Sequence, residues 1–357
     1  MSRRSLLIVA GTGSLLGCVP AATAQEWTWT SLHPAGSAQS SVRAVAPGLQ
    51  GGYAMVDGLI HASVWSGSAS SWEDLHPRGA AISQIFGTDG RQHVGEAYFD
   101  FSSNAVLWSE RGWTNLNAPG MAASRAWGVA GGQQVGFARL AGENEHAGYW
   151  TGSAESWVDL HPAGAARSLA YATTGTQQAG YVDVTPGVTH AALWSGTAQS
   201  WVDLHPSGYL GSIALGMAGG QQVGGARLSN GMTRAGIWSG SASSWVSLHP
   251  DGWGESGAVA TTGLYQVGAV GTGFDGRASL WSGSASSWVD LDAVLPSYFT
   301  LSSAQSITEV DGRLIIGGWA VNSLTGQTEA VVWSQIPSPG TIAPIGLLAL
   351  ISARRRR

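Results

Sequence analysis

Residues 194–206 read Trp-Ser-Gly-Thr-Ala-Gln-Ser-Trp-Val-Asp-Leu-His-Pro, and copies of this stretch organise the rest of the chain. Its second tryptophan recurs with spacings of 43, 41, 44, 44, 44 and 43 residues. A nearly constant spacing in this range is typical of repeat architectures. The tryptophans of this series are Trp29, Trp72, Trp113, Trp157, Trp201, Trp245 and Trp288.

One period, residues 157–200, contains four short segments with β propensity, separated by Gly, Pro and Ser turns. Four antiparallel strands per period are typical of a β-propeller blade. We expect the strand that begins near Ser168 to be innermost, because small residues suit a crowded central channel, and the Trp157 segment to be outermost. Serine recurs at the start of the innermost segment as Ser41, Ser83, Ser124, Ser168, Ser212 and Ser256.

The first tryptophan of the unit appears seven times, each time three residues after an alanine. The chain starts with an outermost-type strand and ends with a third-type strand, so that each end lacks the partner that the other supplies. Pairing them would close the ring and remove two exposed sheet edges, whereas an open solenoid would need capping units. The sequence therefore predicts an all-β fold, a closed seven-bladed β-propeller of four-stranded blades over residues 25–335, with the last blade completed by the N-terminal strand.

Residues 1–24 have the pattern of a signal peptide. Arg3 and Arg4 precede an apolar run, and Ala22-Thr23-Ala24 fits a cleavage site. Residues 15–18 resemble a lipoprotein box that would leave a lipidated Cys18, and residues 2–7 loosely resemble a twin-arginine signal. We favour ordinary cleavage after Ala24, which would remove the only cysteine.

Residues 336–357 form a second candidate sorting signal, at the C-terminus. A Pro-Ser-Pro sequence at 337–339 is followed by an apolar segment and four arginines. The apolar segment is shorter than the roughly 20 residues that a membrane-spanning helix needs. This layout resembles the PEP-CTERM sorting tails of Gram-negative bacteria, although Ser338 stands where that motif has glutamate. The resemblance implies removal of the tail by an exosortase-like enzyme and a location at the cell surface or outside the cell.

The repeat itself resembles the HAF family of extracellular repeats over about residues 27–334. His-Ala occurs at 61–62, 146–147 and 190–191, and Gln-Gln-Val-Gly occurs at 133–136 and 221–224. The resemblance implies export and brings no chemistry with it. The phenylalanine that follows His-Ala in that family is absent, and four repeats replace the histidine with Asn104, Arg234, Arg277 or Glu329.

Composition argues against a nucleic-acid partner. Charged residues make up only 11% of the chain, against about 25% in typical domains. Removing the two end segments takes away six of the 17 basic residues and none of the 22 acids, which leaves a net charge of −11. No basic surface remains to bind phosphates. We expect a monomer.

Histidine and tryptophan recur at fixed repeat positions, which indicates structural roles, because a catalytic residue occurs once. All nine histidines and fourteen of the 18 tryptophans follow the repeat. Asp159 and His161 carry metal-ligating groups, as do Asp203 and His205, but a ring would hold the two pairs apart. No nucleophile elbow, P-loop, zinc spacing or calcium loop is present. We therefore expect no catalytic, metal or cofactor site.

The loops after Leu-His-Pro and those before His-Ala vary between repeats, and both should lie on one face, which makes that face a candidate binding surface. Tyr209 and Trp253 are aromatic where other repeats have small residues. For Trp253 the alternative is that it folds back between two blades. The candidate ligand-face residues are Arg78, Tyr209, Asp251, Trp253 and Glu255.

The leading interpretation is an exported, non-enzymatic module that binds or scaffolds envelope or extracellular polysaccharides. The alternative is a propeller enzyme, a glycan lyase or hydrolase, with acids at the channel mouth. Glycoside hydrolysis needs two carboxyl groups facing each other at about 5–10 Å. Candidate acids in variable positions are Asp100, Glu143, Glu145, Asp183, Asp251, Glu255 and Asp275.

Overall fold

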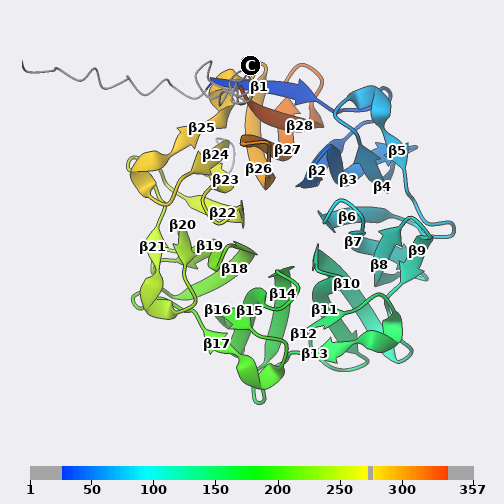
Figure 1. Ribbon diagram of the computed structural model, residues 1–357, viewed down its shortest axis with the longest axis vertical. Coiled ribbons are helices and arrows are strands. Elements are labelled where there is room, and N and C mark those ends of the chain that lie inside the picture. Colours follow the sequence, from blue (N-terminus) through cyan, green and yellow to red (C-terminus); the bar gives the residue numbers. More distant parts are fainter. Residues whose placement is uncertain (1–25, 272–275, 337–357) are drawn as a thin grey trace, which may run out of the picture. The chain divides into compact units, whose positions relative to one another are not determined.

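Seven four-stranded antiparallel sheets lie around a central opening in the computed structural model, which describes residues 26–271 and 276–336 (Figure 1). The predicted all-β, seven-bladed β-propeller is confirmed. The predicted signal peptide and residues 337–357 of the predicted sorting tail lie outside the described residues, as does Asp275.

Six blades are continuous in sequence and run from the innermost to the outermost strand. Blade 1 contains β2 (Ser40–Ala46), β3 (Leu49–Val56), β4 (Leu59–Trp65) and β5 (Glu73–Asp74), and blade 2 contains β6 (Ser83–Thr88), β7 (His93–Phe99), β8 (Ser102–Ser109) and β9 (Gly112–Asn115). Blade 3 contains β10 (Met121–Ala130), β11 (Gln133–Leu140), β12 (His146–Trp150) and β13 (Val158–Asp159), and blade 4 contains β14 (Arg167–Thr173), β15 (Gln178–Thr185), β16 (Val188–Trp194) and β17 (Val202–Asp203). Blade 5 contains β18 (Gly211–Ala218), β19 (Gln221–Arg227), β20 (Thr233–Trp238) and β21 (Val246–Ser247), and blade 6 contains β22 (Ser256–Thr261), β23 (Gln266–Val270), β24 (Arg277–Trp281) and β25 (Val289–Asp290).

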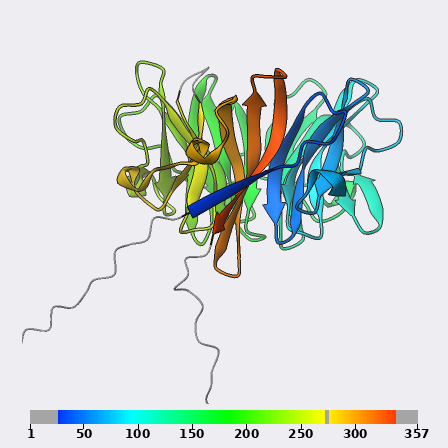
Figure 2. The ribbon, with the colours of Figure 1, turned by 90° about the horizontal axis from the view of Figure 1, so that it is seen from above.

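Blade 7 joins the two ends of the propeller. It consists of β26 (Phe299–Val310), β27 (Arg313–Asn322), β28 (Gln327–Ile336) and the N-terminal β1 (Glu26–Ser31), which is the neighbour of β28. Just after β1, the Leu32 amide donates to the carbonyl of Ala330 at 2.8 Å. In Figure 2, β1 is the dark blue arrow that crosses beside the orange and red strands of this sheet. The predicted closure of the last blade by the N-terminal strand is confirmed.

Five of the hairpins between third and outermost strands contain one-turn 3₁₀ helices, for example Ala154–Ser156. The Ser156 hydroxyl closes this turn, because it donates to the carbonyl of Ser153 at 2.6 Å and accepts from the Thr151 amide at 2.8 Å. The buried Gln134 accepts from the amide of Gly152 at 2.8 Å. This glutamine contact, which fixes the hairpin to the second strand, recurs at Gln50, Gln178, Gln222 and Gln266. No helix in the described residues is long and apolar enough to cross a membrane.

The serine at the start of each innermost strand lies buried between blades. Ser83 accepts a hydrogen bond from the Ala62 amide of the preceding blade at 2.9 Å, and its hydroxyl lies 2.8 Å from Nδ1 of His76. Nε2 of His76 is 2.9 Å from the carbonyl of Ala80, which can only accept. His76 therefore carries its proton on Nε2, and Nδ1 accepts from the serine.

We name this chain of contacts the inter-blade link, and it closes the whole ring. The alanine amide lies 2.9 Å from the serine hydroxyl in all seven cases. The idea that these serines are small because they crowd the channel is wrong: they are small because they fit between blades and exchange hydrogen bonds there. The structure also places Ser40, not Ser41, in the first blade, and the full set is Ser40, Ser83, Ser124, Ser168, Ser212, Ser256 and Ser302.

Two blades build the link without histidine. Asn117 accepts from Ser124 at 2.7 Å and donates to the carbonyl of Met121 at 3.2 Å, so that its amide supplies the same acceptor and donor as a neutral imidazole. Asp292 accepts from Ser302, and burial raises the pKa of its carboxyl. Burial conversely lowers the pKa of four of the linking histidines, which favours the neutral form that the link requires; these are His76, His161, His205 and His249.

The first tryptophan of each repeat forms the core between neighbouring blades. Trp194 of blade 4 is fully buried and belongs to a cluster with Val135 and Leu160 of the preceding repeat. Equivalent clusters surround Trp65, Trp150, Trp238, Trp281 and Trp333. Because each cluster spans two blades, every blade depends on its neighbours for burial of its large side chains.

Candidate binding site in the central channel

Each innermost strand contains a β-bulge three residues after its linking serine. In β10, for example, Ala126 pairs with Gly136 and Gly128 pairs with Val135, which leaves Trp127 as the extra residue. A bulge re-aims the extra side chain, and all seven extra residues line a central cavity of about 470 Å³. We name them the channel ring: Arg43, Phe86, Trp127, Tyr171, Leu215, Val259 and Gln305.

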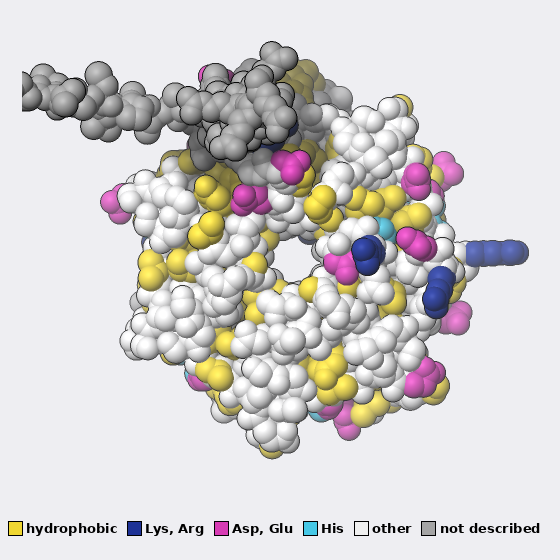
Figure 3. All heavy atoms as spheres, in the orientation of Figure 1, with side chains coloured by type: hydrophobic (Ala, Val, Ile, Leu, Met, Phe, Trp, Pro, Cys, Tyr) yellow, Lys and Arg dark blue, Asp and Glu magenta, His cyan; other side chains and the backbone are white. Residues whose placement is uncertain are grey.

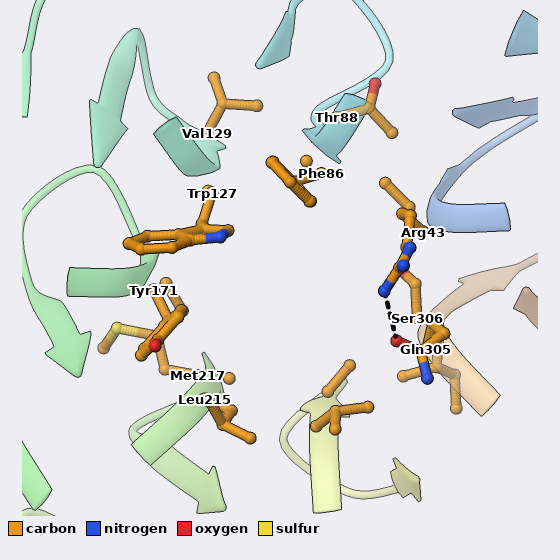
Figure 4. A pocket seen from close by; sticks show the side chains of 18 of the residues that line it. Arg43, Phe86, Thr88, Trp127, Val129, Tyr171, Leu215, Met217, Gln305 and Ser306 are labelled. Carbon is orange, nitrogen blue, oxygen red and sulfur yellow. Dashed lines mark hydrogen bonds between the residues drawn. The ribbon is translucent and has the colours of Figure 1, made fainter. Parts of the chain in front are cut away.

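The channel ring is asymmetric, although the blades that carry it are repeats. Phe86, Trp127 and Tyr171 come from three successive blades, whereas Arg43 and Gln305 come from blades 1 and 7 (Figure 4). Figure 3 shows the opening around which the seven blades are arranged. One arc of the channel is therefore aromatic, and the other carries polar donors and acceptors.

The aromatic arc is held by packing on both sides. The ring centroids of Trp127 and Tyr171 are 4.5 Å apart. The guanidinium of Arg125 lies 5.6 Å from the ring centroid of Trp127 and the same distance from that of Phe86. Glu96, only 2% exposed, holds Arg125 through a 2.7 Å ion pair. These contacts pre-organise the arc as a rigid surface.

The polar arc presents donors that have few partners. Nη1 of Arg43 is 3.5 Å from the Oε1 atom of Gln305, a long contact, and the buried Nε has no hydrogen-bond partner in the described structure. Within residues 26–271 and 276–336, Arg43 forms no salt bridge with a carboxylate. A ligand with an acceptor or an acidic group would satisfy this guanidinium. Across the channel, burial raises the pKa of Tyr171, so that its phenol stays protonated and can donate.

Of the candidate acids that the structure describes, two are brought together. Arg167 brings Glu145 and Asp183 together, at 3.9 and 3.0 Å from its nitrogens. Asp183 also accepts from Thr189 at 2.7 Å. Glu255 accepts from the Thr233 amide at 3.2 Å, and three of the others are exposed on separate loops: Asp100, Glu143 and Asp251.

The predicted ligand-face residues lie apart from the channel ring. Tyr209 packs edge-on against Trp245 at 5.7 Å and accepts from its indole N–H at 3.2 Å. Trp253 is half-buried, packs edge-on against Trp288 at 5.5 Å and has the Arg277 guanidinium over its ring. For Trp253, these contacts are the ones expected if the side chain folds back between two blades and does not serve a ligand. Arg78 and Asp251 are exposed, and Glu255 is half-buried.

Stacked histidine pairs sit beside three of the inter-blade links. His146 and His161 have ring centroids 3.8 Å apart. The Asp159 carboxylate pairs with the ring of His146 and accepts from the backbone amide of His161. The same arrangement recurs around Asp74 and Asp203. In each pair both ring nitrogens of the linking histidine and Nδ1 of its stacked partner are hydrogen-bonded to protein atoms. No group of three or more His, Cys, Asp or Glu in the described residues is arranged to hold a metal.

Sequence reasoning missed the channel ring. The predicted innermost strand is confirmed, but the serine that recurs on it belongs to the inter-blade link and not to the channel. The position three residues later changes from arginine to aromatic to aliphatic along the chain. The residues on either side of this position are mostly alanine or glycine across the repeats, so its wide variation in size and polarity is a signal that the sequence contains.

Comparisons with known proteins bear on the fold. No family model and no curated protein sequence matches this chain. Among solved structures it is similar to the BP39L lectin from Burkholderia pseudomallei (17% identity, 85% of this chain, 99% of that chain, TM-score 0.50). It is also similar to the propeller domain of the trilobed protease from Pyrococcus furiosus (10% identity, 85% and 98% coverage, TM-score 0.55).

A puromycin-hydrolysing peptidase from Mycobacterium tuberculosis is similar at 14% identity and a TM-score of 0.53, and the match covers 82% of this chain but 52% of the peptidase. The chain thus spans about half of that enzyme's length. The propeller of the Pyrococcus protease is described as having an open velcro topology, whereas here β1 closes blade 7. At these identities the similarity establishes a β-propeller fold and nothing finer.

Proposed function

We propose that this protein is an exported, non-enzymatic binding module, and that it binds an acidic glycan in the central channel. The observation that carries the proposal is the asymmetry of the channel ring. Positions that hold the blades together recur in every repeat, whereas the ring has three aromatic residues on one arc and Arg43 with Gln305 on the other.

Sugars suit such a site because a pyranose has an apolar face of C–H groups and an edge of hydroxyls. The apolar face would pack on Trp127 and Tyr171, and rigid aromatic side chains give large contact area at low entropic cost. Arg43 would pair with a carboxylate of the glycan, since it has no carboxylate partner within the described chain. The cavity of about 470 Å³ lies within the range of small-ligand sites.

Location rests on the sequence of the two ends. The signal-like residues 1–24 support export, and the PEP-CTERM-like tail supports processing by an exosortase-like enzyme and display at the cell surface or outside the cell. A binding module with a net charge of −11 after processing fits an extracellular matrix better than a nucleic-acid surface.

The alternative of a glycan lyase or hydrolase finds less support. A glycosidase needs one carboxyl group that stays protonated and a second that stays ionised, with space for the sugar between them. Arg167 instead contacts both Glu145 and Asp183, so that the two carboxyl groups share one guanidinium. Both oxygens of Asp183 are also engaged, by Arg167 and Thr189.

The test is a glycan array probed with the chain lacking both end segments. We expect binding to uronate-containing glycans, at least tenfold weaker binding for Trp127→Ala, and loss of the preference for acidic over neutral glycans for Arg43→Gln. Val259→Ala, on the opposite side of the same ring, is the matched control and should keep the binding. Absence of glycan binding by the parent chain, or release of shortened glycan products, would refute a non-enzymatic glycan-binding role.

A further inference from the structure

A second cavity adjoins the channel in blades 5 and 6, where the repeat loses side chains. At the pair of positions next to the linking serine, most blades carry at least one long side chain, such as Leu169 opposite Tyr181. In blade 5 the pair is Ile213 opposite Gly225, and in blade 6 it is Gly257 opposite Ala269. Gly211 lies on the other side of the linking Ser212, two pairs from Ile213 along β18.

These missing side chains leave a pocket of about 340 Å³. Gly211, Gly225 and Gly257 contribute to its wall, together with Ile213, and Leu215 lines both this pocket and the central cavity. The volume lies at the lower end of the range for small-molecule sites. We name this space the glycine pocket.

The three positions differ in whether they must be glycine: a Cβ on Gly225 would come within 2.6 Å of the Thr233 side chain, whereas Gly257 has free space around it. None of them has a positive φ, and a Cβ built on Gly257 would meet no atom within 4 Å. A Cβ on Gly211 would meet its nearest atom at 3.3 Å. By contrast, the recurring Gly224 could not carry a Cβ, because the carbonyl oxygen of Ile213 lies 1.9 Å away. Glycine inside a strand costs stability, so that Gly257 keeps a space open at the expense of the fold.

The chemistry of the pocket is apolar with a cationic rim. Its walls are mainly glycine backbone, Ile213 and Leu215, with Thr189 and Thr233 also lining it, and flat peptide surfaces suit a planar ring. Arg227 pairs with Gly211 across the strands, is exposed, and forms no salt bridge within residues 26–271 and 276–336. Two acids are hydrogen-bonded to pocket-lining threonines: Glu255 accepts from the Thr233 amide, and Asp183 accepts from the Thr189 hydroxyl.

We propose that the glycine pocket binds a small aryl carboxylate, with its ring between the glycine walls and its carboxylate on Arg227. This site is separate from the glycan site and does not rest on it. A flat apolar body fills the pocket and releases water from the walls, while a planar guanidinium matches a carboxylate with two parallel hydrogen bonds.

The probe is 2-naphthoate, measured by calorimetry and by ligand-observed NMR with the chain lacking its end segments. We expect saturable binding, at least tenfold weakening in Gly257→Leu, and an unchanged or raised melting temperature in that variant because a leucine fills empty space. Arg227→Gln should remove the preference for 2-naphthoate over the uncharged 2-naphthalenemethanol. Trp127→Ala, in the channel ring, should bind the probe as the parent does.

Three outcomes would overturn the proposal: no saturable binding of 2-naphthoate by the parent chain, undiminished binding by Gly257→Leu, or loss of binding in Trp127→Ala, which would place the probe in the channel. Should Gly257→Leu fail to fold, Gly211→Val narrows the same pocket from the opposite wall and must also weaken binding. Failure of glycan binding would leave these results unaffected.

Discussion

The inter-blade link and the channel ring occupy the same seven strands, three residues apart, and differ in how they vary. The serine of the link is the same in every blade and meets the same backbone amide at 2.9 Å. The channel ring changes from arginine through three aromatic and two aliphatic residues to glutamine. The linking serine is fixed because it must satisfy a buried backbone donor. The bulged residue has no such obligation, since it projects into open space, and is free to serve a ligand.

The strongest way to break this comparison is to remove a core tryptophan, which should be far more damaging than any change in the channel ring. Trp194 is fully buried between blades 3 and 4, and Trp194→Ala should lower the free energy of unfolding by about 3–5 kcal/mol. Denaturant unfolding measures this, with Leu215→Ala in the ring as the comparison. Equal losses for the two variants would contradict the division into structural and free positions.

Breaking one inter-blade link should have the next largest effect. Ser168→Ala leaves the buried amide of Ala147 without an acceptor and His161 without its hydroxyl partner. Such a change costs about 1–3 kcal/mol. Denaturant unfolding would measure the loss, and Ser303→Ala, on the neighbouring position of another innermost strand, should cost less. A neutral result for Ser168→Ala would show that the link adds nothing to stability.

The links also predict that stability depends on pH. Burial lowers the pKa of His161 in the folded chain below its ordinary value of about 6.5, and the neighbouring His146 lowers it further, while the Ala165 carbonyl and Asp159 oppose this. The unfolded chain therefore takes up the proton first. The stabilisation that neutral His161 contributes is complete above pH 6.5. It is lost as the pH falls through the lowered pKa that His161 has in the folded chain.

The variant His161→Asn tests this sign, because Asn117 already makes the link in blade 3 without a titrating group. The melting temperature of the parent should fall as the pH decreases from 8 to 5, and that of His161→Asn should fall less. At pH 8 the two should melt within a few degrees of each other. A variant that loses as much stability as the parent over this range would show that His161 does not contribute.

Much of the architecture could be predicted from the sequence because the same pattern of strands and turns occurs seven times. The spacing of Trp29, Trp72 and their successors gave the number of blades, and the incomplete ends gave the closure. The recurring Leu-His-Pro and serine indicate that these residues have a structural role, but they do not predict the inter-blade link. Its third member is the backbone amide of Ala62 in another blade, and a backbone group leaves no pattern in the sequence. The bulge that aims Trp127 into the channel is likewise a property of strand register, which depends on how neighbouring strands pair.

The smallest expected effect on stability is that of replacing Trp253, and this change also tests whether variable loops, like the channel ring, mark a binding surface. It lies in a variable loop, as a ligand residue would, yet it packs edge-on against Trp288 and beneath Arg277. An aromatic pair of this kind is worth about 0.5–1.5 kcal/mol beyond its buried area, so Trp253→Ala should lower the melting temperature modestly. If the channel is the glycan site, the variant should also bind glycans as the parent does. Loss of glycan binding at an unchanged melting temperature would instead place the ligand on the loop face with Tyr209 and Asp251, and would mean that variation in the loops, as well as in the channel ring, marks a binding surface.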